Sequence, residues 1–576
     1  MISPHNHKRL YFASQFLHRS DDRGDSWKTV SPDLSRNRNR YEMPTMGRVW
    51  SLEAAYDLYA MSQYGNITSI SESPLVEGLL YVGTDDGLIH VSENGGESWR
   101  KIERFFDVPK EAFVNDIKAD LHDPDTVYAC LDNHKTGDYK PYLIKSTDRG
   151  KTWNLMVGDL PEKHLCWRIV QDHEKAELFF LATEFGIFCT LDAGEKWFKL
   201  SSGLPTISFR DLEIQKREND LIGASFGRSF YVLDDYSLLR DANPEMFDKS
   251  FHMFPIRRAF WYSQTDRIGG TRGSQGDSMF VAKNPDYGAV FNYYIKSEYK
   301  SKKAKRKKRE AALKKAGKDI PILSIDELRA ESEEQAPQNL LRISDSSGTV
   351  VAKLSLKNSN GIHRAVWKLR IEGLTRSGGP MVAPGTYIAE PFQIVDGKET
   401  SLAEPAEFKV ESISQPTIKG QDRETLIAFI KEAGLMANKI SAARSVLGER
   451  QEQLSKLKET IQKHPQGTAE LIGKATKLKK RLSDYKLKIS GDDLKAEKWI
   501  RSEPSIESRI RGALMSGMSG THGITKTAKQ QYRIGVEQFE SIEKELFELL
   551  DEEIEAFEDE VDKASIPWTS GRDLPE

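Results

Sequence analysis

The sequence predicts a mainly β protein whose C-terminal part is α-helical, and three patterns along its 576 residues support this fold class. A turn of eight residues that ends in tryptophan occurs four times before residue 200. From residue 286 to residue 414, apolar and polar residues alternate with period two between short turns, as in β-strands. From residue 415 to residue 563, apolar residues recur at helical spacing.

The repeated turn predicts a partial β-propeller over residues 1–240. Its copies are SDDRGDSW (20–27), SENGGESW (92–99), STDRGKTW (146–153) and TLDAGEKW (190–197). Each copy follows a run of β-formers, and the tryptophans are 72, 54 and 44 residues apart, which suits propeller blades with loop insertions. About five blade units are expected, the last of which, LIGASFGRSFYVLDD, lacks the tryptophan turn.

The residues shared by the four turns are expected to stabilise the fold. Ser or Thr at the first position and Asp or Asn at the third can accept backbone N–H groups, and glycine at the fifth permits positive φ. An amide, unlike a carboxyl, cannot act as a general acid, so Asn94 favours the structural role. The positions concerned are Ser20, Asp22, Gly24, Trp27, Ser92, Asn94, Gly96, Trp99, Ser146, Asp148, Gly150, Trp153, Thr190, Asp192, Gly194 and Trp197.

The first blade unit is incomplete in the sequence. Later units carry an inner strand before the turn, whereas the chain opens at ISPHNHKRLYFAS, inside the unit. A propeller must close to hide its edge strands, so the chain is expected to be the C-terminal part of a longer propeller. The segment 31–66 is a long insertion whose middle is compatible with a short helix.

A second β domain is predicted after an irregular crossing segment at 241–285, which includes the glycine-rich GGTRGSQGD. Residues 286–414 suit a β-sandwich of immunoglobulin or fibronectin type. Its charged insertion at 300–335 has a basic run over 300–318 followed by acids. We expect this insertion to be a solvated hairpin, partly helical or disordered, rather than a polyanion site.

The apolar stripes between residues 415 and 563 predict a helical hairpin or bundle. One stripe begins at Leu426 and the other at Val536, and the two are expected to pack together. Self-association through residues 420–563 is the alternative. The glycine-rich GALMSGMSGTHG (512–523) is expected to form a loop, and residues 564–576 a tail.

Composition excludes several kinds of site. With 84 basic and 87 acidic residues, the net charge of −3 gives no whole-chain preference for nucleic acid or anionic lipid, so any such preference would have to be local. No nucleic-acid partner is expected. No membrane span is present.

Cys130, Cys166 and Cys189 are expected to be buried free thiols, although a bridge from Cys189 to either of the others remains open. Cysteine and histidine spacings predict no metal site and no cofactor.

Candidate site residues lie where the inner strands begin, because propeller ligands usually bind near the central channel. The ligand-binding candidates are Asn115, Trp167, Arg168, Arg210 and Arg228. Glycoside hydrolysis would need two carboxylates, for which the candidates are Asp116, Asp211 and Glu184. The alternative is that these acids pair with the arginines and connect the inner strands.

The tryptophan turns resemble the Asp-box, or BNR, repeat of sialidases, xyloglucanases and sortilin-type vacuolar sorting receptors. The phrases SPHNHKRLYFAS, ATEFGIFCTLDAGEKW and PWTSGRDLPE resemble a bacterial family of large secreted sortilin-like propeller proteins that are often labelled glycosyl hydrolases. This resemblance implies an extracytoplasmic protein, periplasmic or secreted, although no signal peptide follows Met1.

Three functions follow from the residues and the resemblance together. The leading one is non-catalytic binding of a protein, peptide or glycan by the propeller. The second is a glycoside hydrolase whose site needs N-terminal blades that this chain lacks. The third is an envelope scaffold that assembles through its helices.

Overall fold

The computed structural model describes residues 1–44, 47–51, 53, 64–264, 284–373, 378–413, 420–519 and 522–572. They form two compact units, Met1–Pro244 and Glu245–Glu576, which are described separately. The glycine-rich stretch at 269–277 lies outside the described residues, as does most of the middle of the 31–66 insertion. The described part of that insertion contains a short 3₁₀ helix, Arg40–Glu42.

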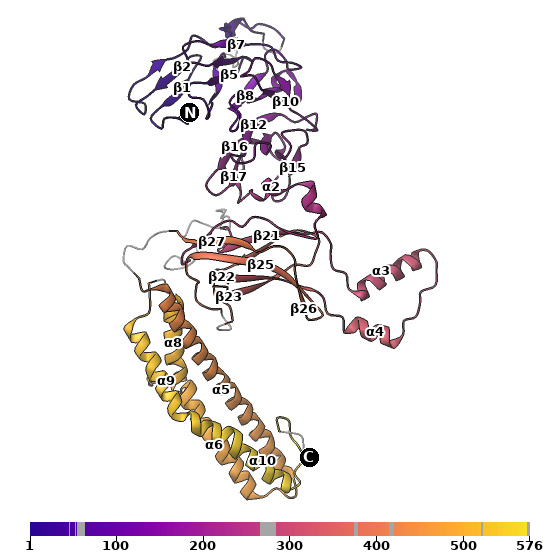
Figure 1. The fold of residues 1–576 in the computed structure, drawn as a ribbon, viewed down its shortest axis with the longest axis vertical. Helices are drawn as coiled ribbons and strands as arrows, with labels where there is room; N and C mark the ends of the chain where they lie inside the picture. Colours follow the sequence, from indigo (N-terminus) through magenta and orange to yellow (C-terminus); the bar gives the residue numbers. More distant parts are fainter. Residues whose placement is uncertain are drawn as a thin grey trace. The chain divides into compact units, whose positions relative to one another are not determined.

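The described part of the first unit contains five antiparallel sheets, each built from consecutive strands (Figure 1). The first sheet contains β1 (Leu10–Ala13), β2 (Leu17–Ser20) and β3 (Lys28–Thr29). The second contains β4 (Ile67–Glu72), β5 (Leu80–Thr84), β6 (Ile89–Ser92) and β7 (Arg100–Ile102). The third contains β8 (Phe113–Ala119), β9 (Val127–Asn133), β10 (Asp138–Ser146) and β11 (Asn154–Leu155).

The last two sheets follow the same order. The fourth contains β12 (Cys166–Gln171), β13 (Phe179–Thr183), β14 (Gly186–Thr190) and β15 (Phe198–Leu200). The fifth contains β16 (Phe209–Gln215), β17 (Asp220–Ser225) and β18 (Phe230–Leu233), and the short helix α2 (Leu238–Asp241) follows it. The inner strands β4, β8, β12 and β16 lie beside one another in turn, which is the arrangement of propeller blades.

Apolar side chains fill the spaces between successive sheets. Trp153 belongs to the core shared by the second and third sheets, and Trp197 to the core shared by the third and fourth. Trp27, on the first sheet, is 47% exposed. Cys130, Cys166 and Cys189 are free and buried, so the predicted bridge alternative does not occur.

The second unit begins with two sheets that share one core. One sheet has the order β19 (Phe251–Met253), β21 (Ala289–Ile295) and β24 (Gly361–Trp367). The other has the order β20 (Ala259–Trp261), β27 (Ala406–Ser412), β25 (Gly385–Val395), β22 (Gln338–Asp345) and β23 (Val350–Leu356), with β26 (Lys398–Ser401) paired to β25. Phe291, Trp367, Tyr387 and Phe408 lie in the core between them. Strands β19 and β20 lie in the segment 241–285, which was expected to be irregular. They were not predicted because their pairing partners, β21 and β27, are distant in sequence.

A bundle of helices around one apolar core ends the chain. Its elements are α5 (Arg423–Lys463), α6 (Ala469–Ser490), α7 (Asp493–Glu497), α8 (Ile506–Ser519), α9 (Lys526–Phe547), a π-helical turn (Glu548–Glu553) and α10 (Ile554–Lys563). The loop predicted for 512–523 is wrong over 512–519, which belong to α8. A Cβ at Gly517 would lie 2.8 Å from Ile430 Cγ1, so close packing against α5 overrides the low helix propensity of glycine there. None of the described helices is both long and apolar enough to cross a bilayer.

Candidate ligand-binding site

Each inner strand of the first unit is irregular at the same place. The register with the second strand shifts just before Ser69, Asp116, Arg168 and Asp211. One residue of each inner strand is therefore a bulge, and bulges change the direction in which a side chain points. We call these residues the bulge row: Thr68, Asn115, Trp167 and Arg210.

The first two members of the bulge row connect neighbouring sheets. The Thr68 hydroxyl donates to the carbonyl of Val114 at 2.6 Å. The Asn115 amide donates to the carbonyl of Cys166 at 2.9 Å and to the Asp132 carboxylate at 2.8 Å. Both side chains thus donate to the inner strand of the next sheet, and these hydrogen bonds join neighbouring sheets.

The last two members of the bulge row contact each other instead. The Arg210 guanidinium carbon lies 3.6 Å from the centroid of the Trp167 ring, and the Trp167 indole N–H donates to Glu184 at 3.1 Å. The Arg210 side chain is 44% exposed, and its guanidinium lies 3.8 Å from Glu184. Phe226, 5.3 Å from the same guanidinium, is 70% exposed. A cation, an acid and an aromatic ring therefore gather at an accessible place.

The residues that follow the bulge row also join the sheets. Ser69 Oγ accepts the N–H of Ile117 at 2.8 Å, and Asp116 accepts the N–H of Ile169 at 3.2 Å. Arg168 extends this series, because its guanidinium binds Asp116 at 2.9 Å and Asp211 at 2.8 Å. Two of the three predicted carboxylates, Asp116 and Asp211, thus share one arginine.

The two carboxylates of this shared pair differ in environment. The Asp116 side chain is 1% exposed, whereas that of Asp211 is 57% exposed. Burial raises the pKa of the Asp116 carboxyl above its ordinary value, although Lys118 and Arg168 oppose the shift. Asp116 is thus closed to solvent, while Asp211 is open to it.

Asp132, His134 and Phe226 lie in this region but were not among the predicted site residues. Asp132 is buried and contacts Nδ1 of His134, and the His134 ring lies edge-on to Trp167 with 6.0 Å between centroids. The histidine spacings predict no metal site. The stretch Asp132-Asn133-His134 at the end of β9 nevertheless places an acid two residues before a histidine, a pattern from which this contact could have been predicted. His134 adds a polar ring next to Trp167. We call His134, Trp167, Glu184, Arg210 and Phe226 the Trp167 face.

Arg228 is the remaining predicted site residue. It lies in the turn between β17 and β18, two residues beyond Phe226, and it is exposed. Of the predicted ligand-binding residues, the structure brings Trp167 and Arg210 into direct contact, whereas Asn115 bonds to the carbonyl of Cys166 and Arg168 to Asp116.

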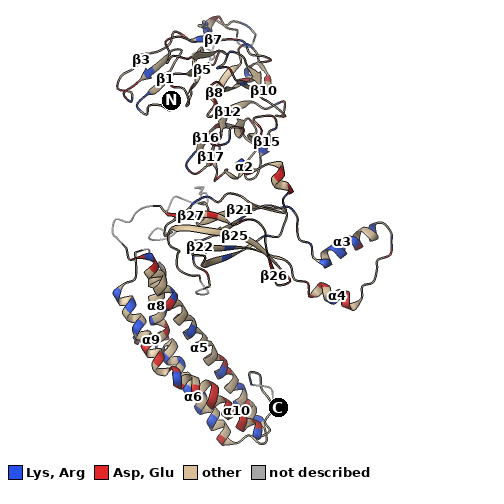
Figure 2. Cartoon of the chain, viewed as in Figure 1, with Lys and Arg blue, Asp and Glu red and all other residues tan. Residues whose placement is uncertain are grey.

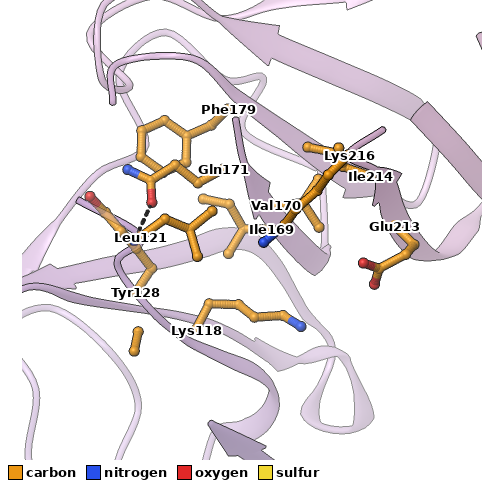
Figure 3. A pocket seen from close by; sticks show the side chains of 11 residues that line it. Lys118, Leu121, Tyr128, Ile169, Val170, Gln171, Phe179, Glu213, Ile214 and Lys216 are labelled. Carbon is orange, nitrogen blue, oxygen red and sulfur yellow. Dashed lines mark hydrogen bonds between the residues drawn. The ribbon is translucent and has the colours of Figure 1, made fainter. Parts of the chain in front are cut away.

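A small pocket lies at the other end of the same inner strands (Figure 3). Ile169, Val170 and Phe179 line it, and the N–H of Leu121 donates to the Gln171 side chain at 2.8 Å. Its volume is about 140 Å³, below the roughly 300 Å³ at which ordinary ligand pockets begin. We therefore place the candidate site at the Trp167 face and not here.

The tryptophan turns lie between the outer strands, away from the bulge row along each sheet. In the third turn, Ser146 Oγ donates to Asp148 at 2.7 Å and accepts the N–H of Gly150 at 2.8 Å. Asp148 also accepts from the backbone and hydroxyl of Thr152, and the Trp153 indole donates to the carbonyl of Gly150. The turn beginning at Ser20 shares this pattern. The turn beginning at Ser92 shares the backbone bonds, but there the Asn94 amide donates to the Ser98 hydroxyl at 3.0 Å.

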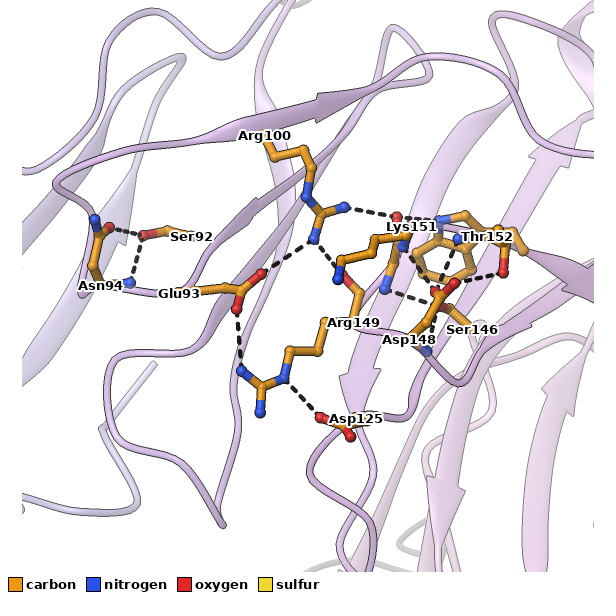
Figure 4. Close-up of polar contacts among 12 residues, drawn as sticks. Ser92, Glu93, Asn94, Arg100, Asp125, Ser146, Asp148, Arg149, Lys151 and Thr152 are labelled. Carbon is orange, nitrogen blue, oxygen red and sulfur yellow. Dashed lines mark hydrogen bonds and ion pairs between the residues drawn. The ribbon is translucent and has the colours of Figure 1, made fainter.

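The third turn is also bound by the neighbouring sheet (Figure 4). Arg100, from β7, donates to the carbonyls of Arg149 and Gly150 at 2.7 and 3.0 Å. Arg149 in turn binds Glu93 at 3.1 Å and Asp125 at 2.7 Å. In the fourth turn, Lys196 replaces the hydroxyl residue and the Trp197 indole N–H has no hydrogen-bond partner.

Comparisons with known proteins found no matching protein-family model and no matching curated protein. Among solved structures, the chain is similar to YCF48 bound to D1 peptide, with 14% identity over 30% of this chain and 51% of that one and a TM-score of 0.23. It is also similar to the GH74 enzyme of Niastella koreensis, with 13% identity, 41% and 35% coverage and a TM-score of 0.30. An ancestral GH74 enzyme matches with 11% identity, 73% and 47% coverage and a TM-score of 0.31. The chain spans about half or less of each of these structures, and such TM-scores support no inference about activity.

Proposed function

We propose that the first unit binds a ligand without catalysis and that the Trp167 face is the place where it does so. The observation that supports this most is the change along the bulge row. The polar groups of Thr68 and Asn115 donate hydrogen bonds to the next sheet. The Arg210 side chain, in contrast, is 44% exposed where it lies on Trp167 beside Glu184. The same backbone position is thus structural in two sheets and accessible in the last.

A protein or peptide is the ligand class that this chemistry favours, with a glycan as the alternative. Arg is among the residues that most often dominate the binding energy of protein interfaces, and Phe226 adds exposed apolar area, whereas Trp167 is buried and holds Arg210 in place. Arg210 can fork onto a carboxylate, and Glu184 can accept from an amide or a hydroxyl. We further propose, from the four tryptophan turns, that the protein is an exported Asp-box propeller protein of the sortilin-like family.

Glycoside hydrolysis is the weaker proposal. It needs one carboxyl that donates a proton and a second that attacks or activates water. Asp116 is shielded by Arg168 and the N–H of Ile169, and Glu184 is bound by Trp167 and lies near Arg210. Asp211 is open to solvent but paired with Arg168. The acids at this place thus hold arginines and an indole in position.

The experiment is a screen of the full chain against peptide and glycan arrays, followed by titration of any ligand found. We expect Arg210→Ala and Phe226→Ala to weaken binding by roughly tenfold or more, since anchor residues contribute at least that much. Arg217→Ala, on the exposed turn at the far end of the same hairpin, is the matched control. An empty screen, or equal weakening by all three variants, would reject the proposal. Glycan cleavage that disappears in Asp211→Asn would establish the hydrolase instead.

A further inference from the structure

The charged insertion of the second unit is an ordered helical hairpin that joins β21 to β22. Its helices are α3 (Lys302–Lys315) and α4 (Ile325–Ser332). Ser301 Oγ caps α3 by accepting the N–H of Ala304 at 3.1 Å, and Ser324 and Glu327 form a capping box on α4. Neither helix has a buried residue, so caps and charges stabilise the hairpin without an apolar core.

The acids of the hairpin leave nearly all of the charge on α3 unpaired. Helix α3 has seven lysines and two arginines against one glutamate, whereas α4 has three acids and one arginine (Figure 2). Arg306 binds Glu310 and Glu331, each at 2.8 Å. Among the ion pairs of the described residues, none involves a lysine of α3. Proximity in sequence therefore does not neutralise the basic run.

The unpaired lysines form two lines along α3. At 100° per residue, Lys303, Lys307 and Lys314 follow one flank, and the other flank carries Lys305, Lys308 and Lys315. Ala304 and Ala311 lie between the two flanks, roughly opposite Arg306. The helix thus has a broad basic face, about 21 Å long, with small residues along its middle.

We propose that this basic face docks on the surface of an anionic phospholipid bilayer. A flat charged surface can meet both lysine lines at once, because the long flexible stems reach out on either side of the alanines. The face has no bulky apolar residue to insert into hydrocarbon, so the contact is peripheral and screened by salt. It also lacks the aromatic rings that stack on single-stranded bases and the Asn or Gln side chains that read base edges.

The experiment is sedimentation of the full chain with vesicles. We expect binding to vesicles of phosphatidylcholine mixed with phosphatidylglycerol, none to phosphatidylcholine alone, and release by added salt. The variant K303Q/K307Q/K314Q should bind roughly 100-fold more weakly, and replacing both lysine lines should abolish binding. The matched control is K477Q/K480Q/K486Q, which removes three exposed lysines from α6 and should change little.

A charge-conserving variant separates charge from folding. K303R/K307R/K314R keeps every charge and should bind like the unmodified chain, with unchanged helix content by circular dichroism. Equal binding to neutral vesicles, full binding after loss of both lysine lines, or loss of binding in the arginine variant would overturn the proposal. Tighter binding to duplex DNA, with displacement from vesicles, would identify nucleic acid as the partner and also overturn it.

Discussion

The tryptophan turns and the bulge row are both repeated features of the first unit, but they repeat different things. The turns repeat their side chains: a hydroxyl, an Asp or Asn and a glycine make the same hydrogen bonds at residues 20–27, 92–99 and 146–153. The bulge row repeats only the backbone irregularity, and its side chains are Thr, Asn, Trp and Arg.

This difference shows which positions the fold constrains. A turn whose own side chains satisfy its backbone N–H groups needs particular residue types, because an unsatisfied group is costly. A bulge needs only one extra residue, so its side chain is free to serve another purpose. The bulge row is therefore a better place to look for a ligand than the turns.

Asp116→Ala should have the largest effect on stability among these positions. The change leaves the Arg168 guanidinium without its buried partner and the N–H of Ile169 without its acceptor. Breaking one side of a buried pair costs about 3–5 kcal/mol. Urea unfolding followed by tryptophan fluorescence should show this loss. Ser69→Ala, at the corresponding position, should lower the unfolding free energy by less. An equal loss would show that the ion pair of Asp116 with Arg168 adds no stability.

The bulge row itself should divide into structural and accessible members. Asn115→Ala removes the donor to Asp132 and to the carbonyl of Cys166 and should cost about 1–3 kcal/mol of unfolding free energy. Arg210→Ala, at a half-exposed side chain, should cost less than about 1 kcal/mol. The same denaturation measurement applies. If Arg210→Ala is as destabilising as Asn115→Ala, the two halves of the row do not differ in role.

The aspartate of a tryptophan turn should contribute more unfolding free energy where it also accepts from a hydroxyl group. Asp148→Ala removes an acceptor of the Thr152 N–H and hydroxyl and should cost about 1–2 kcal/mol. Asp192→Ala should cost less, because Lys196 offers its backbone N–H but no hydroxyl. Thermal unfolding of the two variants gives the comparison. A larger loss at Asp192 would contradict this ranking.

Acid should weaken the turns in a defined pH range. The Ser26 hydroxyl, followed by that of Ser20, lowers the pKa of Asp22 from its ordinary 3.8 to about 2. In Asp148, burial opposes the shift, but bonds from Thr152 outweigh it and also lower the pKa to about 2. A lowered folded-state pKa stabilises the fold above the ordinary value, and this contribution is lost as pH falls from about 4 to about 2.

Substitutions that keep the cap but not the charge test this pH dependence. D22N/D148N should flatten the fall of the melting temperature between pH 4 and pH 2, because Asn caps the second turn without titrating. N94D should steepen it by the same reasoning. A slope that is unchanged in both variants would show that other carboxyls determine the acid response.

The sequence by itself determined the local features of this protein. Hydroxyl, carboxyl and glycine positions specify the tryptophan turns, because their hydrogen bonds are made within eight residues. Period-two alternation and helical stripes likewise indicate strands and helices, since each follows from the geometry of one element. The candidate site residues at the starts of the inner strands were instead predicted from where propellers usually bind their ligands, and they remain a prediction.

Only the tertiary structure decided which groups meet. Arg168 joins Asp116 to Asp211 across three sheets, His134 reaches Trp167, and Gly517 stays helical against Ile430. The lysines of α3 stay unpaired although acids follow them in the sequence. Such contacts depend on how segments distant in sequence pack together. Where burial or close packing contributes more free energy than intrinsic propensity, the packing decides the local conformation.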